Sequence, residues 1–232
     1  MTPSLLTLRE EILHIGRRMY ERGFVASNDG NISVRLDKDE FLITPTGVSK
    51  GFMSSDSLVR IDNTGQPLFR QSKVSTEAKM HLAIYKQRPD ISAVVHAHPP
   101  YATSFAVARI PLTPCVLPEV VFSLGAVPLV PYALPSSEEL AQQVAEWSER
   151  TDALLLANHG VVALGADALS AYHKLETVEH FAHILWLSQA IGGAKGLSKV
   201  QVADLISIRQ RASTKGRFYA CNQCQYSKLC HE

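Results

Sequence analysis

The chain has 232 residues, 46% of them hydrophobic, and its 23 basic and 22 acidic side chains leave a formal net charge of +1. This length and apolar content suit one large domain with its own core. The balanced charge argues against proteins that bind nucleic acid or membranes electrostatically, and no apolar run approaches the roughly 20 residues of a membrane span. The N-terminus has no basic stretch before a long apolar segment, so we expect no signal peptide and a cytoplasmic location.

Capping signals and hydrophobic periodicity predict the helices in chain order. Thr7 and Glu10 form a capping-box pattern that opens a first helix, and Gly23 ends it. Further helices are expected over 75–88, 100–107, 136–147, 167–191 and 198–213, the third of them opened by a second capping box at Ser136 and Glu139. Short apolar runs between turn residues predict strands over 32–35, 41–43, 59–61, 93–96, 127–130, 153–157 and 161–164.

Several of these strands follow one another directly, with helices interspersed. This order favours a mixed or antiparallel sheet covered by helices on both faces, that is, an α/β domain. We expect that domain to span residues 1–214. The segment 215–232 lacks apolar periodicity and is predicted to be an appended, cysteine-rich tail.

Three histidines stand at the ends of predicted strands. His96 and His98 follow an apolar run, and residues two apart in a strand point to the same face. His159 follows another apolar run in a matching position. Three converging imidazoles with an open coordination position are typical of a catalytic zinc site. On spacing alone, satisfied polar histidines near a surface loop remain an equal alternative.

A candidate anion site precedes the helix over 75–88. The free N–H groups and positive end of a helix N-terminus attract anions, and Ser75 and Thr76 add hydroxyl donors. Glu77 is placed in the first turn, where it could simply stabilise the helix. The glycine-containing turns over 28–31 and 44–47 could complete an anion cradle, or they could be ordinary β-turns.

As a set, the segments 30–35, 43–48, 75–77, 94–98 and 157–160 resemble the class II aldolase/adducin family in order and spacing, and within it the L-fuculose-1-phosphate aldolases. The resemblance implies a three-layer α/β/α fold with a central, mainly antiparallel sheet. It also implies a homotetramer with its sites near subunit interfaces.

The resemblance also assigns roles to residues of this chain. It implies that His96, His98 and His159 bind zinc and that Glu77 is the acid/base. The residues that match the family's phosphate site are Asn31, Thr46, Gly47, Ser75 and Thr76.

The implied activity is a zinc-dependent aldolase. It would cleave a ketose 1-phosphate to dihydroxyacetone phosphate and an aldehyde through a metal-stabilised enediolate, with Mn²⁺ or Co²⁺ as substitutes for Zn²⁺. Alternatives of the same fold are a sugar-acid phosphate decarboxylase and a methylthioribulose-phosphate dehydratase. A non-catalytic, adducin-like scaffold is the alternative from another class, and the presence of all three histidines and Glu77 argues against it.

The chain departs from the fuculose enzymes at two places. They carry a tyrosine proton donor in the segment matching 114–122, where this chain has none and Glu119 is the obvious polar residue. Glu119 could be an acid/base in its own or a neighbouring site, or a surface residue. Tyr219 lies where those enzymes have a second tyrosine, but its cysteine-rich context does not match.

Other polar groups have weaker claims to function. Cys221, Cys224 and Cys230, with His231, could bind a second metal, or the tail could be free. His173, Glu176, His180 and His183 share one helix and could bind another metal, although polar positions of a packed helix are favoured. Arg35 and Lys50 could reach a phosphate, with surface roles as the favoured alternative.

Overall fold

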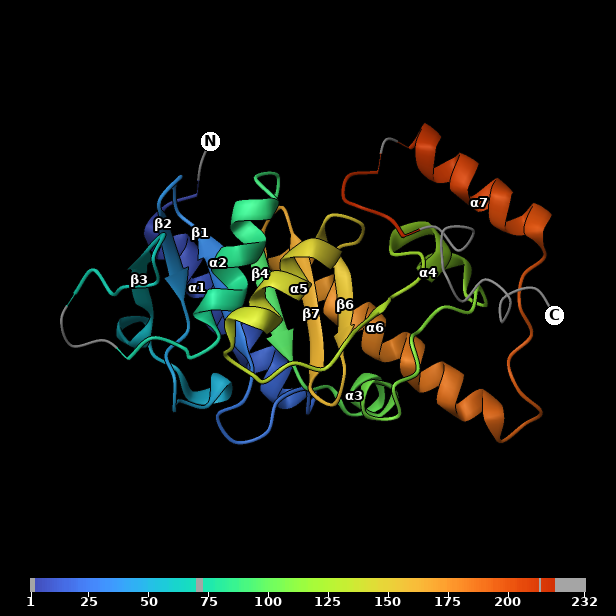
Figure 1. The fold of residues 1–232 in the computed structure, drawn as a ribbon, viewed down its shortest axis with the longest axis horizontal. Coiled ribbons are helices and arrows are strands. Elements are labelled where there is room, and N and C mark those ends of the chain that lie inside the picture. Colours follow the sequence, from blue (N-terminus) through green and yellow to red (C-terminus); the bar gives the residue numbers. More distant parts are fainter. Residues whose placement is uncertain (1–2, 70–72, 213, 220–232) are drawn as a thin grey trace.

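The computed structural model describes residues 3–69, 73–212 and 214–219. Within them, seven strands form one sheet in the order β3-β2-β1-β4-β7-β6-β5 (Figure 1). Neighbouring strands of this sheet are antiparallel, except for the parallel pair β5 and β6. The strands are β1 (Asn31–Arg35), β2 (Glu40–Ile43), β3 (Val59–Asp62), β4 (Ala93–Ala97), β5 (Leu129–Val130), β6 (Ala153–Leu156) and β7 (Gly160–Gly165).

Helices cover both faces of the sheet. Buried side chains of α1, α3 and α6 form a core with one face, and those of α2 and α5 form a second core with the other. The helices are α1 (Leu5–Glu21), α2 (Ala78–Gln87), α3 (Pro100–Val107), α4 (Pro118–Ser123), α5 (Glu138–Ser148), α6 (Ala168–Gln189) and α7 (Lys199–Arg211), with short 3-10 helices at Lys50–Phe52 and Ser55–Ser57. The predicted three-layer α/β/α fold with a mainly antiparallel sheet is confirmed.

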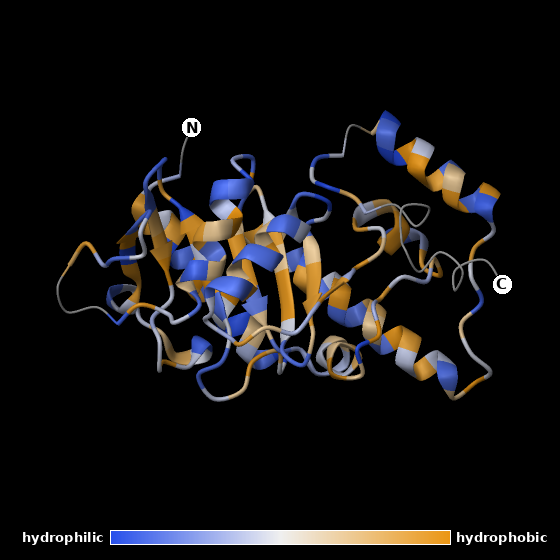
Figure 2. Ribbon diagram, in the orientation of Figure 1, coloured by the Kyte–Doolittle hydropathy of each residue, from blue (hydrophilic) through white to orange (hydrophobic). Residues whose placement is uncertain are grey.

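The central strand β4 is buried on both faces, as its continuous apolar run requires. Figure 2 shows the strands of the sheet as mostly hydrophobic, beside helices in which hydrophilic and hydrophobic residues alternate. Val95 and Ala97 belong to the core of α1 and α6, whereas Val94 belongs to the core of α2 and α5. His96 alternates with Val95 and therefore faces the α2 layer.

Two predicted helix caps differ from those in the structure. Ser4, not Thr7, caps α1, because the Ser4 hydroxyl accepts the Thr7 N–H at 3.1 Å and Thr7 lies inside the first turn. Ser137, not Ser136, caps α5 by accepting the Leu140 N–H at 3.1 Å. Ser136 has φ of 65°, which is incompatible with the extended backbone of an N-cap residue.

Two other segments were also predicted incorrectly. The strand expected over 127–130 is reduced to Leu129–Val130, because Val127 instead exchanges backbone hydrogen bonds with Leu112 at 2.8 and 3.1 Å. Helix α4 was not predicted. It begins at Pro118, where a proline fits the first helical position because that residue needs no N–H partner.

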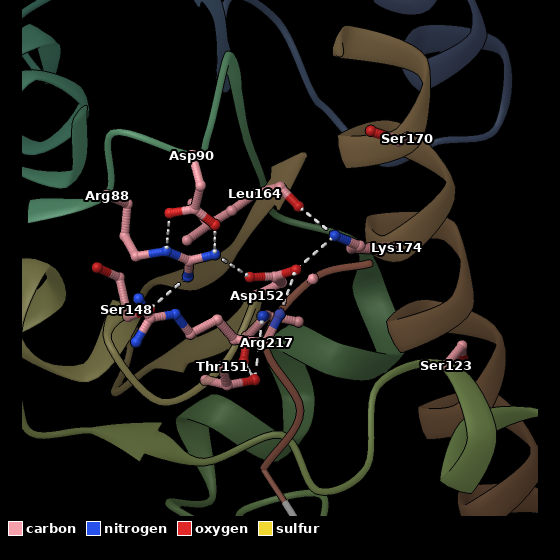
Figure 3. Close-up of polar contacts among 12 residues, drawn as sticks. Arg88, Asp90, Ser123, Ser148, Thr151, Asp152, Leu164, Ser170, Lys174 and Arg217 are labelled. Atoms are coloured by element: carbon pink, nitrogen blue, oxygen red, sulfur yellow. Dashed lines mark hydrogen bonds and ion pairs between the residues drawn. The ribbon is translucent and has the colours of Figure 1, made fainter. Parts of the chain in front are cut away.

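One buried carboxylate joins four parts of the fold (Figure 3). Asp152, 1% exposed and just before β6, accepts hydrogen bonds from the Arg88 guanidinium at the end of α2 (2.8 Å) and from the Lys174 ammonium on α6 (2.7 Å). It also accepts the Arg217 backbone N–H at 3.0 Å. Asp152 therefore ties β6, both helix layers and the C-terminal segment together.

The first residues of the predicted tail pack on the domain. Tyr219 is 5% exposed, its carbonyl accepts the Ala126 N–H at 2.9 Å, and its ring lies edge-on to Trp147 with centroids 6.2 Å apart. The boundary between 214 and 215 stays a prediction. The cysteines proposed for a second metal, Cys221, Cys224 and Cys230, lie outside the described residues. No helix in the described part of the chain is long and apolar enough to cross a membrane.

We expect Asp152→Ala to lower the free energy of unfolding by about 3–5 kcal/mol, because it removes the buried partner of two cations. Asp90→Ala is the matched control: Asp90 pairs with the same arginine, but its side chain is 52% exposed, and we expect a loss of about 1 kcal/mol. Denaturant titration of both variants measures the difference. Equal losses would show that burial of Asp152 does not govern its contribution.

Candidate active site

The register of the central strands places the first metal-ligand candidate. Asn31 of β1 lies directly opposite His96 of β4, which in turn lies opposite Val162 of β7. The His96 ring is fully buried, and its Nδ1 lies 2.9 Å from the Val161 carbonyl. Because a carbonyl only accepts, Nδ1 carries the proton and Nε2 keeps its lone pair for a ligand.

His98 stands one residue beyond the end of β4. Its backbone N–H donates to the Phe24 carbonyl at 3.0 Å, which ties the strand end to the loop after α1. Its ring Nε2 lies 3.1 Å from Nε2 of His96, and its Nδ1 lies 3.5 Å from a carboxylate oxygen of Asp29. The side chains of the His-x-His pair converge, as predicted.

His159 joins them from the turn between β6 and β7. Asn158 adopts φ of 56°, a left-handed conformation that asparagine tolerates, and thereby turns the chain before His159. The His159 ring centroid lies 4.7 Å from that of His96 and 5.1 Å from that of His98. A Cβ at Gly160 would stand 2.5 Å from the Ala97 carbonyl oxygen and 2.6 Å from Cδ2 of His98. Only glycine allows this close approach.

The three rings fit a metal ion. Their ligand atoms lie within 4.8 Å of one another. Burial lowers the pKa of His96 well below its usual range, and His159 and His98 lower it further. With its Nδ1 proton directed at the Val161 carbonyl, His96 presents the Nε2 lone pair toward Nε2 of His98 at 3.1 Å. Nitrogen ligands of a tetrahedral zinc lie about 3.4 Å apart, which is close to this spacing.

The alternative metal site on α6 is not formed. Among the described residues, the group of His, Cys, Asp or Glu side chains that lie close enough together to hold an ion consists of His96, His98 and His159. Glu176 instead pairs with Arg18 and Arg22 at 3.4 and 2.8 Å, and His183 stacks on Tyr101 with centroids 3.8 Å apart.

Glu77 lies against the histidines rather than inside helix α2. The helix begins at Ala78, Glu77 is its N-cap residue, and the Glu77 side chain makes no capping hydrogen bond. The alternative of Glu77 as a first-turn helix stabiliser is therefore not supported. The carboxylate oxygens lie 3.3 Å from Nε2 of His96 and of His159, and Oε2 accepts an N–H from the Asn31 amide at 2.7 Å. The buried Oε1 has no hydrogen-bond partner among the described residues.

A cavity of about 170 Å³ opens beside this cluster. It brings together Asn31, Thr46, Ser75 and Thr76 of the predicted phosphate site, but Gly47 does not line it. The other lining residues are Asn28, Asp29, Gly30, Pro45, Glu77, His98, Pro135, Ser136 and His159. Sequence reasoning missed Pro135 and Ser136. In the sequence, these two residues indicated only the start of a helix and gave no sign of a cavity.

Lys50 and Arg35 do not line this cavity. The Lys50 ammonium, 1% exposed, donates to the carbonyls of Asn28 (2.9 Å) and Val48 (2.8 Å) and thereby joins the two loops that border the cavity. Arg35 donates to the Tyr85 carbonyl at 2.8 Å and stacks over the Phe41 ring. The favoured surface role is therefore wrong for Lys50, whose pKa burial lowers to about 8.

The structure does not bring Glu119 or Tyr219 to the cavity of its own chain. Glu119 is exposed in the first turn of α4, whose Val121 packs beside Val202 and Leu205 of α7 at the far end of the molecule (Figure 1). Tyr219 is buried against Trp147. The interpretation of Glu119 as an acid/base in its own site is not supported, and a role in a neighbouring copy's site stays a prediction.

The family follows from comparison with known proteins. Residues 10–186 match the model of the Class II Aldolase and Adducin N-terminal domain. The chain belongs to this family. It is 36% identical to the 3-oxo-tetronate 4-phosphate decarboxylase of Haemophilus influenzae, over 86% of this chain and 96% of the relative. It is 37% identical to the L-fuculose phosphate aldolase of Methanococcus maripaludis, over 76% and 95%.

A solved structure supports the same membership. An L-fuculose 1-phosphate aldolase superposes with a TM-score of 0.81 at 30% identity, and the match covers 90% of this chain and 98% of that one. The resemblance read from the motifs is therefore confirmed. The relatives carry two different reactions on one fold, so membership alone does not select the reaction of this class II aldolase homologue.

We expect Gly160→Ala to weaken zinc binding by about 10–100-fold, because the added methyl group displaces the His98 ring. Competition with a chromophoric chelator measures the affinity. Gly23→Ala is the control: Gly23 has φ of 69°, so alanine is strained there, but a Cβ at Gly23 meets nothing within 4 Å. It should reduce stability by about 1 kcal/mol and leave zinc affinity unchanged. Unaltered zinc affinity in Gly160→Ala would contradict the steric argument.

The buried Lys50 ammonium predicts a pH dependence of stability. Its pKa is about 8 in the folded protein, against the ordinary value of 10.5 that it takes in the unfolded chain. The unfolded chain therefore binds more protons between these two values, and this group makes stability rise with pH across that window, by roughly 3 kcal/mol. Subtracting the unfolding free energy of Lys50→Met from that of wild type at each pH isolates the effect. A difference that stays constant with pH would contradict it.

Proposed function

We propose that the chain is a divalent-metal-dependent lyase that breaks a carbon–carbon bond next to the ketone of a phosphorylated sugar or sugar acid. One observation carries the proposal: three imidazoles and the Glu77 carboxylate converge at one end of a cavity lined by hydroxyl and amide groups. A non-catalytic scaffold has no need for such a cluster. Zinc is the proposed ion, with Mn²⁺ or Co²⁺ as substitutes.

The metal and Glu77 would divide the chemistry between them. A divalent ion on His96, His98 and His159 would supply Lewis acidity toward the ketone oxygen. Glu77 has one oxygen fixed by Asn31 and one free, so it can take and return a proton without leaving its place. In the aldolase reaction, Glu77 takes the substrate hydroxyl proton, the carbon–carbon bond breaks, the aldehyde leaves, and the proton is returned to the enediolate carbon.

Neutral donors would hold the phosphate. Ser75 and Thr76, at the approach to α2, and Thr46 and Asn31 offer hydroxyl and amide groups, and in the described part of the chain no Lys or Arg lines the cavity. Hydrogen bonds from such groups, together with the helix N-terminus, suit a phosphate dianion. A fixed phosphate would present the reacting carbon to Glu77 in one orientation, which lowers the entropic part of the barrier.

The decarboxylase is the second candidate, and the relatives support it as well as they support the aldolase. One observation favours it: Glu119 lies outside the cavity of its own chain. Loss of carbon dioxide from a 3-oxo-tetronate 4-phosphate leaves the same enediolate as the aldolase reaction. Protonation of its carbon by Glu77 then gives dihydroxyacetone phosphate. No aldehyde forms, so no further acid/base is needed at a departing hydroxyl.

A homotetramer with sites at its interfaces, a cytoplasmic location and a role for Glu119 in a neighbouring copy remain part of the proposal. The dehydratase remains a third reaction of the same fold.

The test is a product assay on the zinc-loaded protein with L-fuculose 1-phosphate and 3-oxo-tetronate 4-phosphate. We expect dihydroxyacetone phosphate from one of them, with carbon dioxide release only in the decarboxylase case. Chelation should abolish activity and zinc should restore it. Glu77→Gln should lower kcat by about 10²–10⁴-fold with zinc retained.

Glu138 is an exposed carboxylate in the first turn of α5 that pairs at 3.9 Å with Lys79, so Glu138→Gln is the matched control and should keep wild-type kcat. Wild-type activity in Glu77→Gln would show that Glu77 is not the acid/base. A protein that binds no divalent ion would contradict the proposal as a whole.

A further inference from the structure

A buried ladder of hydrogen bonds runs from the site into the layer between β1 and α2. On β1, Asn31 and Ser33 point to one face because they are two residues apart. On α2, His81 and Tyr85 lie four residues apart, one and two turns after Glu77. The two rows interlock in the spatial order Glu77, Asn31, His81, Ser33, Tyr85. Asn31, Ser33, His81 and Tyr85 are at most 4% exposed.

Each contact in the ladder is short. The Asn31 amide nitrogen donates to Glu77 at 2.7 Å, and the Asn31 amide oxygen lies 2.5 Å from Nε2 of His81. Nδ1 of His81 lies 2.7 Å from the Ser33 hydroxyl, which lies 2.8 Å from the Tyr85 hydroxyl. The Tyr85 hydroxyl also lies 2.9 Å from the Ser33 carbonyl, so its single proton is directed at both oxygens of Ser33.

The direction of these bonds follows from donor counting. A carboxylate only accepts, so the Asn31 amide must present its NH₂ group to Glu77 and its oxygen to His81. His81 must then donate from Nε2 and accept from the Ser33 hydroxyl at Nδ1. The opposite histidine tautomer would turn the Asn31 amide over and set its carbonyl oxygen against the Glu77 oxygens. Burial lowers the pKa of His81 to about 4, so the ring carries one proton near neutral pH.

We propose that His81 is a positioning residue that keeps the Asn31 amide pointing its NH₂ group at Glu77 and at the substrate phosphate. This inference rests on the proposed function, because the phosphate and the proton-transfer role of Glu77 belong to it. Glu77 must change its protonation during turnover, and a neutral carboxyl group could donate to a turned amide oxygen. The His81 N–H holds that oxygen, so Asn31 stays a donor in every step.

Four variants separate this role from simple packing. His81→Phe keeps the ring and removes the N–H. His81→Gln restores an N–H donor near the place of Nε2. Ser33→Ala removes the hydroxyl that holds Nδ1 as an acceptor. Tyr85→Phe is the matched control, because it removes a buried hydroxyl of the same ladder but leaves the bond between Ser33 and His81.

The first measurement is the His81 tautomer, from nitrogen NMR spectra of isotope-labelled protein. We expect the Nε2–H tautomer in wild type and in Tyr85→Phe, and a mixture in Ser33→Ala. An Nδ1–H tautomer in wild type would overturn the inference. This measurement needs neither substrate nor activity.

The second measurement is calorimetric binding of inorganic phosphate to the zinc-loaded proteins. We expect about tenfold weaker binding in His81→Phe, with zinc content unchanged, and near wild-type binding in His81→Gln and Tyr85→Phe. Wild-type affinity in folded His81→Phe would overturn the inference and leave the proposed function intact. If wild type binds no phosphate, the proposed phosphate site fails, and the tautomer decides about His81. If His81→Phe does not fold, Ser33→Ala takes its place. Weaker phosphate binding by Ser33→Ala then supports the inference, and phosphate binding equal to that of wild type overturns it.

Discussion

The site depends on the register of three strands. Asn31, His96 and Val162 face one another across β1, β4 and β7, and the carbonyl that fixes the His96 tautomer belongs to the neighbouring Val161. Because side chains alternate along a strand, a slip of one residue would turn His96 into the opposite core. The apolar residues of β4 are buried on both faces and prevent this slip. The packing of the sheet thus determines where the metal ligands converge.

The same constraint explains how much could be predicted from the sequence. Local signals were sufficient for the fold class, because the apolar runs, the proline and glycine breaks and the helical periodicity act over short distances. The His96–His98 pair follows from strand alternation, and His159 from its matching strand-end position. The order of strands in the sheet is a property of long-range pairing. The convergence of His159 with the pair therefore could not be derived from spacing and came from the family resemblance.

Residues whose role depends on burial were predicted less well. Lys50 is a charged residue that looks exposed in sequence, yet its ammonium lies inside and joins two loops through their carbonyls. Asp152 carried no motif, although it binds cations from both helix layers. Glu119 was a candidate acid/base because of its position in the sequence, but it lies on α4, outside the cavity of its own chain. The four-residue spacing of Glu77, His81 and Tyr85 can be seen in the sequence. Their contacts with Asn31 and Ser33 depend on how β1 packs against α2, which the sequence does not show.

The departures at Glu119 and Tyr219 affect one half of the chemistry. The aldolase and decarboxylase reactions share the enediolate, so the proposed metal ligands, Glu77 and the proposed phosphate donors would serve both. They differ in the fragment that leaves. When an aldehyde forms, the substrate hydroxyl that becomes its oxygen must lose a proton, whereas a carboxylate leaves as carbon dioxide with no proton to remove. A cavity whose acid/base functions are concentrated on Glu77 is sufficient for the second reaction within one chain. In the aldolase reaction as proposed, Glu77 serves both ends of the proton transfer, and a second acid/base at the position of the tyrosine of the fuculose enzymes would have to come from another copy. Under the proposed function, a neighbouring copy would therefore select between the two reactions, while the residues of this chain would hold the ketone, the phosphate and the proton.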